Sequence, residues 1–300
     1  MSPRPSLTTR SPRPTTRWRW ALLAALGLVA ASCGEDDAQT GVVQLVDEDT
    51  TVVVANSPGT LTTNGPQRVL VALVGSGPNA FIGADDQPAV VELEAVGGSA
   101  AGEVTAEWLS NPGVELGLYV ATFTFDEPGV WQVGIKGADE SLAAALVDVA
   151  DDSSVPEAGD PAPRSETPTG ASLDELSTIS TDPNPEPDFY DLSVAEAVEN
   201  GRPTVIVFAT PQFCRTAICG PTVEIAKDIA SGHDGIDFVH VEPFDIEAAR
   251  AGALEPIEAM FDWGLVTEPW VFVVDDTGVI SASFEGIVGA AELERALGEL

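Results

Sequence analysis

The apolar positions between residues 41 and 150 recur at the spacing of β-strands rather than of helices. Residues 68–75 (RVLVALVG) and 89–96 (AVVELEAV) are rich in β-branched side chains and are bounded by glycine and proline. Residues 117–126 (GLYVATFTFD) alternate strictly, and residues 130–137 (VWQVGIKG) do so again after a turn. About seven such strands predict an antiparallel β-sandwich. Its core side chains would include Tyr119, Ala121, Phe123, Phe125, Trp131, Val133 and Ile135.

The last part of the chain, residues 188–300, changes to a pattern in which strands and helices alternate. Apolar runs of strand length occur at 204–210 (TVIVFAT), 236–242 (IDFVHVE), 269–275 (PWVFVVD) and 279–286 (VISASFEG). Helices are predicted from a capping box at Ser193 to residue 200, and at 219–231, 253–263 and 289–300. The order β-α-β-α-β-β-α predicts an α/β domain that follows the all-β domain.

The residues between these two patterns have the composition of a linker. Residues 151–187 are rich in proline, serine, threonine, aspartate and glutamate, which predicts a semi-extended acidic connection. The predicted organisation is therefore a β-sandwich at 41–150, a linker at 151–187 and an α/β domain at 188–300.

The N-terminus carries a targeting signal. Five arginines fall within the first 19 residues, and the apolar run at 21–32 is too short to span a bilayer. The sequence Ala-Ala-Ser-Cys-Gly ending this run resembles a bacterial lipobox, with Ala30 where leucine is more usual. The resemblance implies a lipoprotein signal peptide at 1–32, a lipid on Cys33 and a polar tether at 33–40. We therefore expect a membrane-anchored protein on the extracytoplasmic side.

The charge of the chain limits its partners. The formal net charge is -35, with 48 acidic and 13 basic residues. Nucleic acid phosphates and anionic lipid surfaces repel such a chain, so no nucleic acid partner is expected. The charge fits a solubilising surface.

Two cysteines remain if Cys33 carries the lipid. Cys214 and Cys219 are separated by four residues, and in an oxidising exported compartment a nearby pair is expected to form a disulfide. Cys219 opens a predicted helix, whose N-terminus favours a thiolate, and Arg215 adds a nearby cation. Glu268 opposes both effects if it lies beside the thiols.

Residues 186–300 resemble the thioredoxin fold. The string VIVFATPQFC resembles the strand-to-cysteine segment of membrane-tethered thioredoxin-like proteins, and PWVFVVDDTGVI resembles the later strand and turn. The resemblance implies that Glu268-Pro269 is the cis-proline bond facing the cysteines and that Pro269 shapes the substrate groove. Because Cys-Gly-Pro-Thr at 219–222 resembles the family's Cys-Gly-Pro-Cys, it also implies that Cys219 attacks and Cys214 resolves. Separately, the string GLYVATFTFDEPGVWQVGI resembles the late strands of Ig-like domains.

Several functions fit the cysteine pair. The leading hypothesis is a thiol-disulfide oxidoreductase acting on exported proteins that carry thiols or disulfides. A non-catalytic adaptor with a structural disulfide is the alternative. Pro211, Thr216 and Cys219 resemble the peroxiredoxin pattern with one extra residue, which suggests a peroxidase in which Cys214 resolves. Similarity to Sco-type copper chaperones suggests a fourth function, although the segment that would supply their histidine has none.

A few further residues are candidates for supporting roles. His240 and Glu242 alternate on one face of a predicted strand near its C-terminal end, where Glu242 would accept a thiol proton or orient His240. Trp263 and Trp270 would pack in the core or line a groove. No cofactor and no resident metal are expected, and residues 41–150 contain no histidine, methionine or cysteine.

Overall fold

The computed structural model describes residues 50–76, 81–85, 87–111, 116–136 and 145–300. The chain separates into two compact units, 1–37 and 38–300, and every described residue belongs to the second. The predicted signal peptide, the tether and the lipid site at Cys33 lie outside the described residues. Within the described ranges, no helix combines the length and apolar character that crossing a membrane requires.

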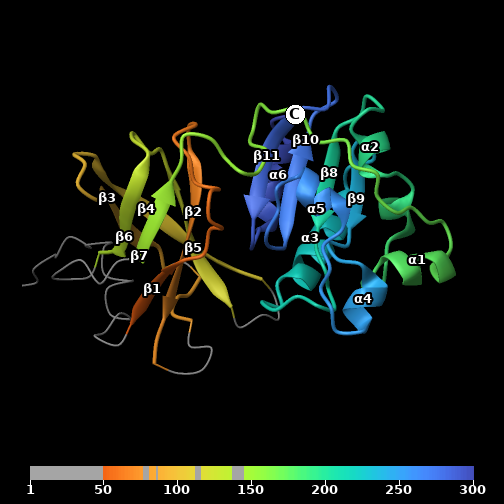
Figure 1. Cartoon of the computed structure of the whole chain (residues 1–300), viewed down its shortest axis with the longest axis horizontal. Coiled ribbons are helices and arrows are strands. Elements are labelled where there is room, and N and C mark those ends of the chain that lie inside the picture. The colour runs from red at the N-terminus through yellow and green to blue at the C-terminus, as the bar shows by residue number, and fades with distance from the viewer. Residues whose placement is uncertain (1–49, 77–80, 86, 112–115, 137–144) are drawn as a thin grey trace, which may run out of the picture. The chain divides into compact units, whose positions relative to one another are not determined.

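The first part of the described chain is a seven-stranded antiparallel sheet (Figure 1). The strands run in the order β1-β2-β5-β4-β3-β6-β7, and the two edge strands β1 and β7 approach each other so that the sheet is nearly closed. We call this part the β lobe. Its strands are β1 (Thr51–Val54), β2 (Gln67–Val74), β3 (Ala89–Ala95), β4 (Ala101–Ser110), β5 (Gly117–Phe123), β6 (Gly129–Ile135) and β7 (Ala145–Val149).

One long strand, β4, makes this sheet continuous where the sequence predicted two separate sheets. The first part of β4, Ala101–Ala106, pairs with β3, and the second part, Glu107–Ser110, pairs with β5. Because the same strand takes part in both ladders, the two halves join in one sheet. The alternating pattern shows which side chains face the core, but it does not show how a strand divides its partners.

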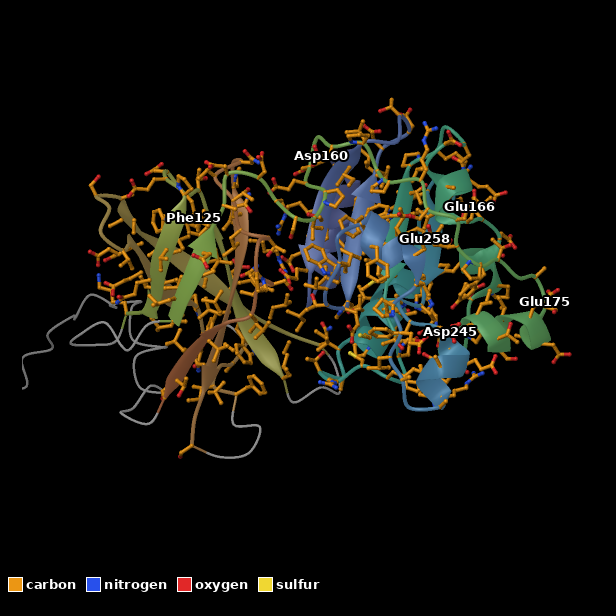
Figure 2. The ribbon with its side chains drawn as sticks, in the orientation of Figure 1. Phe125, Asp160, Glu166, Glu175, Asp245 and Glu258 are labelled. Carbon is orange, nitrogen blue, oxygen red and sulfur yellow. The ribbon has the colours of Figure 1, made fainter. Side chains whose placement is uncertain are left out.

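The core of the β lobe contains the side chains that the alternation predicted. Tyr119, Trp131, Val133 and Ile135 are completely buried in one cluster, and Phe125 is also buried there. The ring of Phe125, labelled in Figure 2, meets Trp131 edge-on at 4.9 Å between centroids. Hydrophobic burial of these rings therefore holds the β lobe together.

The second part of the described chain is built on a four-stranded sheet, and we call it the mixed lobe. Its strand order is β11-β10-β8-β9; β8 and β9 are parallel, and the other two pairs are antiparallel. The strands are β8 (Thr204–Phe208), β9 (Asp237–Val241), β10 (Trp270–Val274) and β11 (Ile280–Glu285). The helices are α2 (Val194–Ala197), α3 (Cys219–Ala230), α4 (Ile246–Arg250), α5 (Glu258–Asp262) and α6 (Ala290–Leu297).

The four predicted strands and most of the predicted helices of this lobe are confirmed, whereas the helix predicted at 253–263 is shorter. It begins only after Ile257, because Pro256 forms an isolated β-bridge with Phe244. An additional short helix, α4, precedes it. Asp245 caps α4 by accepting a hydrogen bond from the backbone N–H of Ala248 at 2.7 Å.

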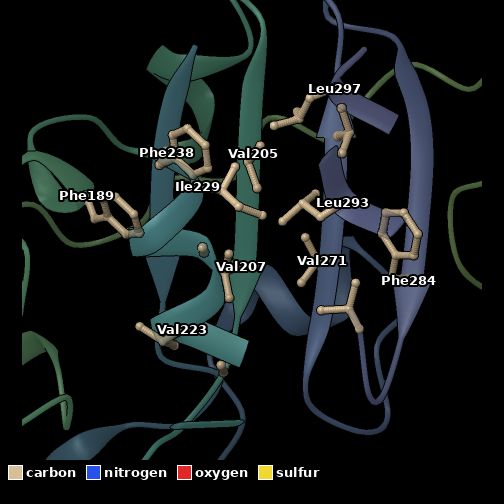
Figure 3. Packing of buried hydrophobic residues seen from close by; sticks show 14 of the residues in the cluster. Phe189, Val205, Val207, Val223, Ile229, Phe238, Val271, Phe284, Leu293 and Leu297 are labelled. Carbon is tan, nitrogen blue, oxygen red and sulfur yellow. The ribbon is translucent and has the colours of Figure 1, made fainter. Parts of the chain in front are cut away.

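Both faces of the mixed sheet are covered, which explains why its two central strands, β8 and β10, are buried at every position. Val205 and Val207 of β8 point into one cluster, and Ile206 and Phe208 point into another on the opposite face. Figure 3 shows the first cluster, where side chains from α3 and α6 pack over the strands. The start of α3 is thereby held against the end of β8, and this position carries the two cysteines.

Residues 151–187, predicted to be an extended linker, contribute to the packing of the mixed lobe. Val155 and Ala162 are buried in one of its clusters, and Leu176 is completely buried in the other. The segment contains α1 (Leu173–Ile179), and the 3-10 helix η1 (Pro187–Tyr190) begins at its end. A few well-placed apolar side chains therefore anchor a segment whose average composition is that of a linker.

Arg68 of β2 joins the β lobe to the mixed lobe. Its guanidinium donates to both carboxylate oxygens of Glu292, each at 3.0 Å, and to the carbonyl oxygens of Glu285 and Ile287. The carboxylate of Glu285 in turn accepts a hydrogen bond from the backbone N–H of Ser57 at 2.7 Å. A bidentate, largely buried guanidinium is a directional contact, so the strand register of β2 is tied to β11 and α6.

Candidate functional site

The two cysteines lie on either side of a short loop between β8 and α3. The backbone N–H of Cys214 donates to the carbonyl oxygen of Thr210 at 3.1 Å, and α3 begins at Cys219. Ala217 has a φ of 59°, the left-handed region that residues other than glycine rarely adopt. The loop then returns so that the backbone N–H of Cys219 donates to the Sγ of Cys214 at 3.4 Å. Four intervening residues are therefore enough to bring the two thiols together.

The two thiols, both free, have opposite environments. Cys214 is half-buried, whereas Cys219 is completely buried. Hydrogen bonds from the Cys219 thiol, the Thr216 hydroxyl and the backbone N–H groups of both residues lower the pKa of Cys214 to about 5. The same thiol pair, together with burial, raises the pKa of Cys219 above its ordinary value. At neutral pH the site therefore holds one thiolate, on Cys214, and one thiol, on Cys219.

Glu268 and Pro269 complete the cluster around the sulfurs. The peptide bond between them is cis, as the thioredoxin resemblance implied. A carboxylate oxygen of Glu268 and the two sulfurs all lie within 4.8 Å of one another. Burial and the negative charge of Cys214 raise the pKa of Glu268 to about 7, and Arg215 partly offsets this effect. Glu268 is therefore able to exchange a proton near neutral pH, next to both thiols.

An apolar cluster surrounds the cysteine loop. Ile218 and Ile287 of the mixed lobe are buried together with Leu70 and Leu118 of the β lobe, and Cys214 packs against this group. Apolar surroundings exclude water from one side of the thiolate, which leaves the hydrogen bonds described above as its main stabilising contacts.

His240 belongs to a buried chain of hydrogen bonds and not to the thiol cluster. Its Nδ1 accepts from the hydroxyl of Tyr190 at 2.6 Å, and its Nε2 donates to the carbonyl oxygen of Ala209 at 2.9 Å. The hydroxyl of Ser180 donates to Tyr190 at 2.8 Å and accepts from the backbone N–H of Asp182. Burial lowers the pKa of His240, so the ring is neutral, and each group in the chain has a consistent donor or acceptor role.

Glu242 also lies away from the thiols. Its Oε1 accepts hydrogen bonds at 2.5 Å from both the backbone N–H and the hydroxyl of Thr181. That hydroxyl also accepts from the backbone N–H of Gln212, two residues before Cys214. Glu242 therefore positions the segment before the cysteine loop, and the cluster of carboxylates and thiols in the described residues does not include it.

Thr181 and Tyr190 are the positioning residues that the sequence analysis missed. Both lie in or next to the segment whose composition suggested a linker, and no motif marks either of them. Lys227 on α3 holds the same segment by an ion pair with Asp182 at 2.5 Å and a hydrogen bond to the carbonyl oxygen of Asn184. The only feature of the sequence that indicated a packed segment was the few apolar residues scattered through an acidic stretch.

The contacts of Trp263, Trp270 and Thr216 bear on two alternatives from the sequence: whether the tryptophans pack in the core or line a groove, and whether the site resembles that of a peroxidase. Trp263 is completely buried and Trp270 is 4% exposed, each packed against Phe272, so both belong to the core, and Trp270 also borders a pocket whose lining does not include the cysteines. The hydroxyl of Thr216 contacts the Sγ of Cys214 at 3.3 Å. The peroxidase interpretation makes Cys219 the attacking thiol, whereas the Thr216 hydroxyl contacts Cys214.

Part of the chain is similar to a solved structure. No family model matches the chain, and no curated protein matches it. A solved structure described as MTB DsbF in its mixed oxidized and reduced forms is similar to 35% of this chain and to 84% of its own length. The sequence identity over that region is 20%, and the TM-score is 0.29.

Proposed function

We propose that this protein is a membrane-anchored, extracytoplasmic thiol-disulfide oxidoreductase that exchanges electrons with exported proteins through Cys214 and Cys219. The observation that carries the proposal is the difference in burial and pKa between the two thiols. A half-buried thiolate with a pKa of about 5 lies beside a buried thiol at the start of a helix. A structural cysteine pair has no need for this asymmetry.

The fold of the mixed lobe supports this assignment as a thioredoxin-like domain. A strand leads to the cysteine loop, α3 starts at the second cysteine, and the cis bond at Pro269 opens β10. Pro269 is buried, and its carbonyl oxygen accepts the backbone N–H of Gly286 at 2.9 Å. It would therefore form a rigid floor for the groove that a partner backbone enters.

The N-terminal parts of the chain take supporting roles in this proposal. A lipid on Cys33 would anchor the protein, and the acidic tether would keep it clear of the membrane. The β lobe would act as an Ig-like spacer or docking module, which its seven antiparallel strands and the predicted hairpin at 117–135 support.

The geometry favours Cys214, and not Cys219, as the sulfur that meets the partner. In the oxidised protein a partner thiolate attacks the sulfur of Cys214, the Cys214–Cys219 bond breaks, and Cys219 leaves. Glu268, whose pKa is raised by burial, donates the proton that the Cys219 thiol needs. A second partner thiolate then attacks the mixed disulfide and releases Cys214 as a thiolate. Two electrons pass from the partner, which gains a disulfide, to this protein, which ends as the dithiol.

The low pKa of Cys214 also indicates the direction of exchange. Stabilising the thiolate stabilises the reduced protein, and a dithiol with a stable reduced form has an oxidising disulfide. We therefore propose that the protein oxidises its partners.

A trapping experiment tests the proposal and the order of attack together. The full chain carrying Cys219→Ser is expressed in a bacterium that exports it, because this variant cannot resolve a mixed disulfide on Cys214. We expect partner complexes that disappear on reduction, and none with Cys214→Ser. Equal trapping by both variants would contradict the assigned order, and trapping by neither would contradict exchange chemistry.

The alternative, an adaptor with a structural disulfide, is favoured by the apolar packing around Cys214. The reduction potential separates the two functions. A value between about -120 and -270 mV matches working oxidoreductases, whereas a value below about -300 mV marks a structural disulfide.

A further inference from the structure

Three side chains that bind metal ions in other proteins converge at one point of the mixed lobe. The sulfurs of Cys214 and Cys219 and one carboxylate oxygen of Glu268 all lie within 4.8 Å of one another. Among the described histidines, cysteines, aspartates and glutamates, no other group of three or more is so close. Most aspartates and glutamates close to Glu268 in the sequence are exposed, whereas Glu268 is half-buried beside the thiols. The acidic composition of the chain alone therefore does not account for this cluster.

The spacing of these atoms fits a tetrahedral ion. With metal–sulfur distances of about 2.3 Å and metal–oxygen distances of about 2.1 Å, ligand atoms in a tetrahedron lie about 3.6–3.8 Å apart. Small rotations of the three side chains are enough to reach that spacing from within 4.8 Å. Cys214 and Glu268 are half-buried, so an ion would reach the completely buried Cys219 past these two side chains.

The donor atoms select the kind of ion. Two thiolates bind Mg²⁺ and Ca²⁺ poorly, and a carboxylate is a poor ligand for Cu(I), whereas Zn²⁺ accepts both sulfur and oxygen ligands. His240 does not compete for the position, because Tyr190 and the carbonyl oxygen of Ala209 occupy its two ring nitrogens. Three protein ligands leave a fourth position for water or an external ligand.

The geometry points to a Zn²⁺ site in the reduced protein, formed by Cys214, Cys219 and Glu268. Both sulfurs bind as thiolates: Cys214 is already ionised at neutral pH, and Cys219 releases its proton to solvent, with no change of oxidation state. Forming the Cys214–Cys219 disulfide removes both sulfur ligands and releases the ion, while the two electrons pass to the disulfide of an oxidising partner. Metal and disulfide therefore exclude each other. The inference rests on the reduced state of the proposed dithiol but not on its exchange with partners.

Co²⁺ is the probe for the first test, because its spectrum reports ligand type and geometry. The full chain carrying Cys33→Ser is reduced, freed of reductant under anaerobic conditions and titrated with Co²⁺. We expect thiolate charge-transfer bands and tetrahedral visible bands that saturate at one ion per chain. Zn²⁺ should displace them, and oxidation should abolish them. No bands in the reduced protein, bands that survive Cys214→Ser, or saturation at one ion per two chains would each overturn the inference.

A matched pair of glutamate variants tests the third ligand. Glu268→Gln keeps the size of the side chain and removes its charge, whereas Glu258→Gln makes the same change at an exposed position on α5 (Figure 2). Competition with a chromophoric chelator measures the Zn²⁺ affinity of each. We expect Glu268→Gln to weaken binding at least about tenfold and Glu258→Gln to change it less than about twofold. Equal affinities would overturn the three-ligand site.

The two proposals fail separately. A protein that traps partners through Cys219→Ser but does not bind Co²⁺ loses only the metal site. A protein that binds one Co²⁺ per chain but traps no partner loses only the oxidoreductase function.

Discussion

The ionisation of Cys214 depends mainly on its neighbour Cys219, and a pair of substitutions at that position tests this dependence. The Cys219 thiol makes the largest contribution to the lowered pKa of Cys214, ahead of the hydroxyl of Thr216. Cys219→Ala removes the donor, whereas Cys219→Ser replaces it with a hydroxyl. In a Cys33→Ser background each variant has one thiol, so the chemistry reports Cys214 alone.

The expected size of the effect follows from the hydrogen bond. A hydrogen bond to a charged group contributes about 1.5–3 kcal/mol, and a change of one in pKa corresponds to about 1.4 kcal/mol. Cys219→Ala should therefore raise the pKa of Cys214 from about 5 to about 6–7, and Cys219→Ser should leave it near 5. At pH 5.5 the ionised fraction then falls from roughly 75% in Cys219→Ser to about 3–25% in Cys219→Ala.

The assay is the rate of alkylation by iodoacetamide between pH 4 and pH 10, with each rate divided by its plateau value. The pH at which the rate reaches half of its plateau, the midpoint, is more informative than the rate at neutral pH, because a thiolate of low pKa is also a weaker nucleophile. For a pKa of about 5 instead of 9.0, ionisation increases about 100-fold at pH 7, but nucleophilicity falls about 60-fold. At pH 5.5 a thiol with a pKa of about 5 should therefore be alkylated roughly 40-fold faster than a thiol with a pKa of 9.0.

Two results would refute this reasoning. Equal midpoints in Cys219→Ala and Cys219→Ser would mean that the neighbouring donor does not set the pKa of Cys214. A midpoint of about 8–9 in Cys219→Ser would mean that the loop does not stabilise a thiolate at all. Thermal unfolding of both variants controls for damage to the fold.

Three further predictions concern stability. The pKa of Cys214 is about 5 in the folded protein, and its ordinary value is 9.0. Between these two pH values the reduced unfolded chain therefore binds one more proton than the folded chain. The reduced protein should therefore gain stability from pH 5.5 to pH 8.5 relative to Cys214→Ser, and urea unfolding showing equal pH dependence would disagree. Gly264→Ala places a Cβ 1.9 Å from a backbone carbonyl oxygen at a φ of +65°, and should cost about 2–4 kcal/mol. Gly235→Ala, in open space, should change stability by less than about 1 kcal/mol in the same denaturation series, and similar losses would argue against the contact. Arg68→Gln should cost about 2–3 kcal/mol because it leaves a partly buried carboxylate and two carbonyls without their donor, against about 0–1 kcal/mol for the exposed ion pair lost in Arg202→Gln.

The sequence by itself determined the elements whose side chains repeat with a clear period. The strands of the mixed lobe were predicted as apolar runs, and the core face of the hairpin at 117–135 followed from its alternation. The same pattern placed Cys219 at a helix start, where α3 begins. These predictions succeed because periodicity records which face of an element is buried, and that record is local.

Only the tertiary structure decided which cysteine ionises. A helix start beside Arg215 suggested Cys219, but Cys219 is completely buried, and its N–H and thiol stabilise Cys214 instead. Likewise, Glu242 matched the pattern of a proton acceptor, yet it binds Thr181. Burial and hydrogen-bond partners come from segments far apart in the chain, and no local pattern encodes them.

The segment 151–187 shows the same limit for the fold. Its average composition predicts an extended chain, but Val155 and Leu176 are buried against the mixed lobe. The strand β4 likewise divides its pairing between two neighbours and joins what the alternation alone presented as two sheets. Composition and period describe single segments, whereas packing and strand pairing are properties of segments in contact, so only the folded chain could decide them.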